Sequence, residues 1–104
     1  MRLVIVESPY AGDVEANVAY ARQCLKDCLN RREAPIASHL LYPQVLDDTL
    51  PEERLLGIDA GLAWASVADV QVFYIDRGWS AGMTAARDRA IAEHRTWTVR
   101  RLHG

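Results

Sequence analysis

The chain has 104 residues, half of them hydrophobic and a quarter charged, which suffices for one packed domain, residues 1–104, and excludes two. A formal net charge of −2 argues against binding of a nucleic-acid polymer, because domains built to hold a phosphate backbone are usually strongly basic. The longest apolar run, residues 3–6 (LVIV), is far shorter than the roughly 20 residues of a membrane span, and no signal-peptide pattern is present. We therefore expect a soluble, cytoplasmic protein with no membrane partner.

Segments typical of strands and helices alternate along the sequence. Apolar, β-branched runs indicate strands, and Asp13, Thr49 and Ser80 are expected to cap helices. Residues 38–49 (SHLLYPQVLDDT) have the composition of a loop. In chain order we expect a strand at 2–7, a helix at 14–29, a strand at 34–37, the loop, a helix from 50 to about 67, a strand at 70–75, a helix at 81–94 and a strand at 97–102.

This alternation predicts an α/β fold in which helices cover a parallel sheet. Right-handed crossovers limit the topology, and the simplest strand order is 2-1-3-4. The expected architecture is a single Rossmann-like (flavodoxin-like) three-layer domain with a parallel sheet of about four strands. Ligands of open α/β sheets bind beyond the strand ends at the topological switch point. Here the loops at 8–13 and 76–83 should meet at that crevice.

Small and apolar side chains form the expected core. Trp64 should lie in the core beneath its helix, and Trp97 should pack on the sheet. Cys24 and Cys28 are interpreted as buried core residues, because no nearby histidine or further cysteine completes a metal set. We therefore expect no metal and no cofactor. The inner stripe of the first helix should contain Val14, Val18, Ala21, Leu25 and Cys28 or Leu29.

The loop after the first strand offers groups that can hold a small ligand. It contains neither a dinucleotide fingerprint nor a P-loop. Ser8 and Tyr10 supply hydroxyls, Gly12 frees the backbone, and the amides at the start of the following helix can bind a sugar hydroxyl or a single phosphate. An ordinary strand-to-helix turn is the alternative interpretation.

The loops at 38–49 and 76–83 offer further candidates. Ser80 and Gly82 surround helix amides that should point at the crevice. Asp76, just past a strand end, can bind a ribose hydroxyl or act as an acid, or it can simply stabilise its own turn. Trp79 can stack on a base, anchor the loop or form a subunit contact. His39 can act as an acid, a base or a phosphate donor, although a lone histidine is more often structural.

Three ordered motifs resemble those of a known family. Residues 4–17 (VIVESPYAGDVEAN) are similar to a strand, a Ser-Pro-Tyr-x-Gly-Asp turn and a helix that carries asparagine. Residues 35–48 (PIASHLLYPQVLDD) contain a similar histidine–leucine, proline and paired-aspartate pattern, and residues 76–83 (DRGWSAGM) match Asp-Arg-Gly-x-Ser-x-Gly-Met. The motifs are those of small phage and bacterial domains related to nucleoside 2-deoxyribosyltransferases.

This resemblance implies that a nucleoside or nucleotide binds at the crevice. It also implies a bacterial protein, encoded by the cell or by a phage or prophage. Glu7 and Asp76 are the candidate catalytic carboxylates. The expected ligand-binding residues are Ser8, Tyr10, Gly12, Asp13, His39, Asp48, Ser80, Gly82 and Met83.

The sequence departs from the family pattern at the position of the nucleophile. In active relatives a glutamate three residues after the Gly-Met pair attacks the anomeric carbon and forms a glycosyl-enzyme. Ala86 occupies that position here, and neither Ala85 nor Arg87 can substitute for a carboxylate. The sequence therefore predicts nucleoside or nucleotide binding with weak or no cleavage of the N-glycosidic bond.

Two other functions stay open. The protein is an active N-glycosidase or deoxyribosyltransferase if Glu7, or a carboxylate from a neighbouring subunit, replaces the missing nucleophile. It is a structural or protein-interaction module if side chains fill the crevice. Relatives form dimers or larger assemblies, and the candidates for exposed apolar surface are Trp64, Trp79 and the helix from 50 to about 67. We therefore expect at least a homodimer.

Overall fold

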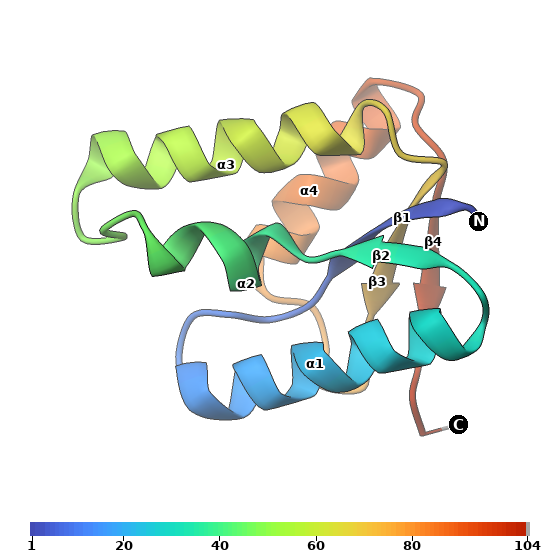
Figure 1. Cartoon of the computed structure of the whole chain (residues 1–104). Helices are drawn as coiled ribbons and strands as arrows, with labels where there is room; N and C mark the ends of the chain where they lie inside the picture. The colour runs from blue at the N-terminus through green and yellow to red at the C-terminus, as the bar shows by residue number, and fades with distance from the viewer. Residues whose placement is uncertain (104) are drawn as a thin grey trace.

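A sheet of four parallel strands, in the order β2-β1-β3-β4, forms the centre of the computed structural model, which describes residues 1–103 (Figure 1). This arrangement confirms the predicted α/β fold and strand order. The elements are β1 (Leu3–Glu7), α1 (Val14–Asn30), β2 (Ala34–Ile36), α2 (Ser38–Leu41), the 3₁₀ helix η1 (Tyr42–Gln44), α3 (Pro51–Ala65), β3 (Val70–Tyr74), α4 (Ala81–Ala92) and β4 (Trp97–Arg100).

The two central strands are largely buried on both faces because helices cover both sides of the sheet, and they are apolar except at Glu7 and Gln71. Val6 pairs with Val72, and both belong to the core cluster that packs against α1. Side chains alternate along a strand, so Glu7 and its partner Phe73 face the opposite side. That side carries α3 and α4 (Figure 1).

The buried face of α1 differs from the predicted stripe. Asp13 caps the helix as predicted, because its Oδ1 accepts from the amide of Ala16 at 3.2 Å. Val14 is 40% exposed, so its predicted burial is wrong. Of the two alternatives at the end of the stripe, Cys28 is buried and Leu29 is 50% exposed. The small side chains of Cys24 and Cys28 allow α1 to approach the sheet closely, and the hydroxyl of Tyr20 donates a hydrogen bond to Asp76. The buried residues are Asn17, Tyr20, Ala21, Cys24 and Cys28, which confirms the core role of both cysteines.

The segment predicted as a loop at 38–49 contains α2 and η1. The predicted cap of α3 is also wrong: Leu50 is the N-cap, with no side-chain bond, and Pro51 follows it. Thr49 cannot cap the helix because its hydroxyl donates to Asp47 Oδ1 at 2.6 Å, within a local turn. The helix ends at Ala65, two residues earlier than expected.

The tryptophans divide between the sheet and the surface. Trp97 packs edge-on against Phe73, with ring centroids 5.8 Å apart, which confirms its predicted place on the sheet. Trp64 is 48% exposed, so the expectation that it belongs to the core is wrong and its interpretation as exposed apolar surface is confirmed. Its indole Nε1 donates to the hydroxyl of Tyr42 at 2.9 Å, and this bond fixes the ring beside η1 instead.

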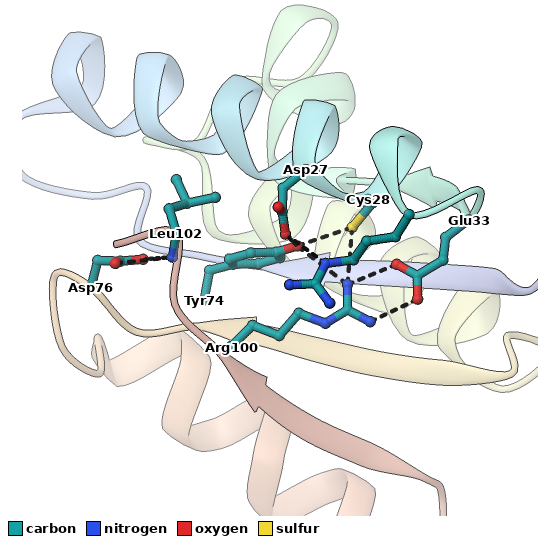
Figure 2. Close-up of polar contacts among 8 residues, drawn as sticks. Asp27, Cys28, Glu33, Tyr74, Asp76, Arg100 and Leu102 are labelled. Carbon is teal, nitrogen blue, oxygen red and sulfur yellow. Dashed lines mark hydrogen bonds and ion pairs between the residues drawn. The ribbon is translucent and has the colours of Figure 1, made fainter. Parts of the chain in front are cut away.

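A buried ion pair ties the edge strand β4 to the opposite edge of the sheet (Figure 2). Arg100 donates through both terminal nitrogens to the two oxygens of Glu33, each at 2.7 Å. The hydroxyl of Tyr74 lies beside the pair, accepts from Arg100 at 3.3 Å and donates to Asp27 Oδ2 at 2.7 Å. Glu33 is only 6% exposed, so its charge depends on this bidentate partner.

Across residues 1–103, none of the helices is long and apolar enough to cross a lipid bilayer.

Replacing Arg100 by methionine leaves the Glu33 carboxylate buried and unpaired, and we expect a loss of about 3–5 kcal/mol in the free energy of unfolding. Urea denaturation followed by circular dichroism measures this loss. The double variant Arg100→Met/Glu33→Met should recover most of it. The control Arg89→Met breaks the exposed ion pair with Glu93, the residue that follows α4, and should change stability by less than about 1 kcal/mol. If Arg100→Met loses no more stability than Arg89→Met, the Arg100–Glu33 ion pair does not have the stabilising role given to it here.

Candidate functional site

A cavity of about 530 Å³ lies between α3, the start of α4 and the sheet. Its position at the carboxyl ends of β1 and β3 agrees with the predicted switch point. Eight of the predicted site residues line it: Glu7, Ser8, Tyr10, His39, Asp48, Ser80, Gly82 and Met83.

Three predicted residues lie outside the lining, contrary to the expected crevice. Gly12 has a φ of +98°, a backbone conformation that glycine adopts most readily, and it shapes the turn into α1. Asp13 caps α1. Asp76 follows Tyr74 at a spacing of two residues and therefore points toward α1, on the other side of the sheet.

The contacts of Asp76 give it a structural role. Its Oδ1 accepts from the hydroxyl of Tyr20 at 2.6 Å and from the amide of Leu102 at 2.8 Å, and its Oδ2 accepts from His103 at 3.1 Å. Figure 2 shows the bond to Leu102, which fixes the chain beyond β4. Burial raises the pKa of the Asp76 carboxyl, but these hydrogen bonds outweigh burial and lower the pKa to about 2. The carboxylate is thus stably ionised and fully used in the fold.

The loop after β1 is held by hydrogen bonds from both sides. Asn17, which is buried in α1, donates to the carbonyls of Tyr10 and Ala11, each at 3.1 Å. Ser8 Oγ lies 2.7 Å from Nε2 of His39, one of the residues that α2 contributes to the cavity. Burial lowers the pKa of His39 to about 4, so the imidazole is neutral at pH 7.

The start of α4 forms another wall. Ser80 Oγ accepts from the amide of Met83 at 3.2 Å, which confirms the predicted cap. The first amides of the helix, near Gly82, lie at the cavity and carry the positive end of the helix dipole. Arg54 of α3 also lines the cavity and is exposed. This part of the wall can attract an anionic group.

Two residues that the sequence did not predict also shape the cavity: Gln71 lies at its inner end, and Gly61 lies in its outer wall. Gln71 lines the cavity and is 2% exposed; a single polar residue within the apolar run VQVFYI was the available signal. Gly61 lies on α3, and a Cβ at this position would meet Ser38 Oγ at 2.8 Å. Two glycines four residues apart inside one helix were the signal for this close approach: Gly61 lies beside Ser38 of α2, and Gly57 lies beside Leu46 and Tyr42.

Trp79 does not line the cavity. Its ring lies against Phe73, with centroids 5.2 Å apart, and Arg87 lies over it at 4.9 Å. Of the three roles considered for this residue, these contacts support an anchor of the loop at 76–83 rather than a platform for a ligand.

The carboxyl of Glu7 is the ionisable group in the cavity that is best suited to proton transfer at neutral pH. Burial raises its pKa to about 7, although the amide of Gln71 and the charge of Arg95 oppose this shift. A carboxyl poised near neutrality can donate or accept a proton, the property of a general acid–base. Among residues 1–103, no group of three or more His, Cys, Asp or Glu side chains is arranged to hold a metal ion.

Comparison with known families gives one finding. The model of DUF7768, described as a domain of unknown function, matches residues 2–101. No curated protein matches the chain.

Glu7 should make stability fall as the pH rises. Its pKa is raised from the ordinary 4.5 to about 7 in the folded state, so its contribution is complete below about pH 4.5 and is lost as the pH rises to about 7. At about 1.4 kcal/mol per pKa unit, the loss is about 3 kcal/mol. His39 acts in the opposite direction, because its lowered pKa favours the fold at higher pH.

The difference in unfolding free energy between wild type and Glu7→Gln isolates Glu7, because His39 is present in both chains. Urea titrations at several pH values between about 4 and 8 measure it. We expect the difference to move in favour of Glu7→Gln as the pH rises through this window. A difference that is independent of pH contradicts the raised pKa.

Proposed function

Because the chain belongs to the DUF7768 family, whose description assigns no activity, we propose its function from the cavity itself: it binds a nucleoside or nucleotide and cleaves it weakly or not at all. The observation that carries the proposal is the joining of the two predicted loops, around Ser8 and Ser80, in one cavity at the switch point of the sheet. This is the position at which open α/β sheets bind nucleotides.

The size and the wall chemistry support a ligand of this class. The volume of about 530 Å³ lies within the range of about 300–1,000 Å³ that is typical of small-molecule sites. Tyr10 and Tyr42 provide aromatic surface, and Asp48 and Ser8 provide polar groups suited to sugar hydroxyls. A nucleoside combines a flat heterocycle with a polyhydroxylated ring, and the wall offers partners for both.

A phosphate group finds complementary charge at one part of the wall. The α4 amides near Gly82 carry partial positive charge, Ser80 supplies a hydroxyl, and Arg54 supplies a full charge. No dinucleotide fingerprint is present in the sequence. A monophosphate is therefore the form that we expect to bind best.

The residue at position 86 argues for binding without covalent catalysis. Ala86 lies in α4 three residues after Met83, on nearly the same side of the helix. The family that the sequence motifs resemble, the nucleoside 2-deoxyribosyltransferase-like domains, uses a glutamate at the matching position, and an alanine cannot attack the anomeric carbon. Bound nucleotide should therefore persist without forming a glycosyl-enzyme.

Glu7 supports a second candidate function, hydrolysis of the N-glycosidic bond. A carboxyl with a pKa near 7 is half protonated at neutral pH and can give its proton to a departing base while water adds to the anomeric carbon. This reaction requires neither a nucleophilic side chain at position 86 nor a second nucleobase as acceptor, because water attacks the anomeric carbon.

Binding should depend on the positive charge at the cavity. We expect the wild type to bind a nucleoside 5′-monophosphate more tightly than the corresponding nucleoside, and Arg54→Ala to weaken monophosphate binding by about 3- to 10-fold with little effect on the nucleoside. Isothermal titration calorimetry measures both affinities. Arg101→Ala, an exposed residue outside the lining, serves as the control and should bind like wild type. Absence of binding across a panel of nucleosides and monophosphates contradicts the proposal and favours an interaction module.

Base release separates the two candidate functions. We expect the wild type to release base from a nucleoside monophosphate at no more than a trace rate, and Ala86→Glu to raise the rate measurably by restoring a carboxylate. Chromatographic detection of free base follows the reaction, with Ala85→Glu as the matched control on the exposed side of α4. Rapid release by wild type that Glu7→Gln abolishes would instead establish Glu7 as the catalytic acid and reject the proposal of binding alone.

A further inference from the structure

The inner end of the cavity is built from side chains of two neighbouring strands. Gln71 of β3 pairs with Ile5 of β1, and Glu7 follows Ile5 by two residues on the same face of the sheet. Glu7 and Gln71 are therefore diagonal neighbours, and both line the cavity. This end lies under α3, away from the exposed Arg54 at the helix start.

Gln71 has a hydrogen-bonding capacity that residues 1–103 do not satisfy. Its side chain is 2% exposed, and its carbonyl oxygen Oε1 has no partner within the described chain. A buried polar atom without a partner destabilises the fold, so such atoms are usually paired with water or ligand. Since the unsatisfied atom is an acceptor in the wall of a cavity, the group that completes it is a donor.

The surrounding charges restrict what kind of donor fits. An anion, such as phosphate, would be repelled at this end by the negatively polarised oxygen atoms of Gln71 and Glu7. A cationic amine would be attracted by the Glu7 carboxyl but repelled by Arg95, whose buried guanidinium has no hydrogen-bond partner among the described residues and lies close enough to act on Glu7. The nearest carboxylate oxygen to Arg95 is that of Glu93, 3.5 Å from Nε. A neutral N–H donor satisfies the acceptor without meeting either charge unfavourably.

The walls beside these polar groups are apolar. Ala65 of α3 and Met83 of α4 line the same cavity and are 4% and 1% exposed. A flat heterocycle gains dispersion and hydrophobic contact between such walls, whereas a sugar ring covered with hydroxyls does not.

We propose that the inner end of the cavity recognises the base of the nucleotide, with the exocyclic amino group of an amino-substituted nucleobase donating to Gln71 Oε1 and the adjacent ring edge facing the Glu7 carboxyl. This inference rests on the proposed function and adds the class of base. The phosphate then lies toward Arg54 and the start of α4. An amino-substituted base binds more tightly than its 6-oxo or 4-oxo counterpart, because the oxo group places an acceptor against an acceptor.

Matched ligand pairs test this inference on the whole chain. Isothermal titration calorimetry compares adenosine 5′-monophosphate with inosine 5′-monophosphate, and cytidine 5′-monophosphate with uridine 5′-monophosphate. We expect the amino member of at least one pair to bind about tenfold or more tightly, the discrimination expected from one buried hydrogen bond that the partner ligand cannot form. Gln71→Met, which keeps the length of the side chain and removes the acceptor, should bring the ratio to within about threefold.

Two controls keep the outcome interpretable. Arg54→Ala should weaken both members of a pair equally and leave the ratio unchanged. If Gln71→Met does not fold, judged by circular dichroism, the side-chain amide signal of Gln71 in ¹⁵N-labelled wild type replaces it. That signal should shift on addition of adenosine 5′-monophosphate and not on addition of ribose 5-phosphate.

The outcomes separate this inference from the proposed function. Tight binding of all four monophosphates without preference for the amino member overturns the inference and leaves nucleotide binding intact. A preference that Gln71→Met does not change, or a Gln71 signal that does not respond to the nucleotide, also overturns it. Failure of every nucleotide to bind overturns both.

Discussion

The parallel pairing of β1 with β3 is the constraint on which the site depends. It aligns Val4 with Val70 and Glu7 with Phe73, so that two strands distant in sequence end side by side. Because right-handed crossovers send α1 to one face and α3 and α4 to the other (Figure 1), the loop after β1 and the start of α4 meet above these strand ends. The cavity is a consequence of this topology, and its chemistry comes from the few polar residues that the pairing places there.

The buried polar groups on the two faces of the sheet differ in how fully they are hydrogen-bonded. On the α1 side, Tyr74 and the Arg100–Glu33 pair satisfy one another through hydrogen bonds (Figure 2), as a structural network requires. On the other side, Gln71 Oε1 has no hydrogen-bond partner within residues 1–103, and the guanidinium of Arg95 has only its ion pair with Glu93, at 3.5 Å. Unsatisfied polar groups in a stable fold often mark a functional site. This contrast is the physical basis for assigning structure to one face and ligand recognition to the other.

The alternation of strand and helix patterns, together with the right-handed crossover rule, was enough to predict the strand order. The caps at Asp13 and Ser80 were predictable because they depend on local sequence. The misplacement of Asp76 and Gly12 has a different origin: loop residues after a strand alternate between the two sides of the sheet, and the tertiary contacts of Tyr20 and Leu102 decide where Asp76 points. Trp64 was misplaced because hydrophobicity alone does not show that Tyr42 offers its indole a partner at the surface. Gln71 was not predicted as a site residue because a single polar residue in a strand indicates a binding site only when its spatial neighbours are known.

The most direct test of the central claim, that the cavity binds a nucleotide, is a crystal structure of the protein grown with adenosine 5′-monophosphate. The account predicts density for the nucleotide between α3, α4 and the sheet, with the base against Gln71 and Glu7 and the phosphate near Arg54 and the first amides of α4. A nucleotide bound elsewhere on the molecule, or a cavity that stays free of nucleotide at saturating concentration, would contradict it.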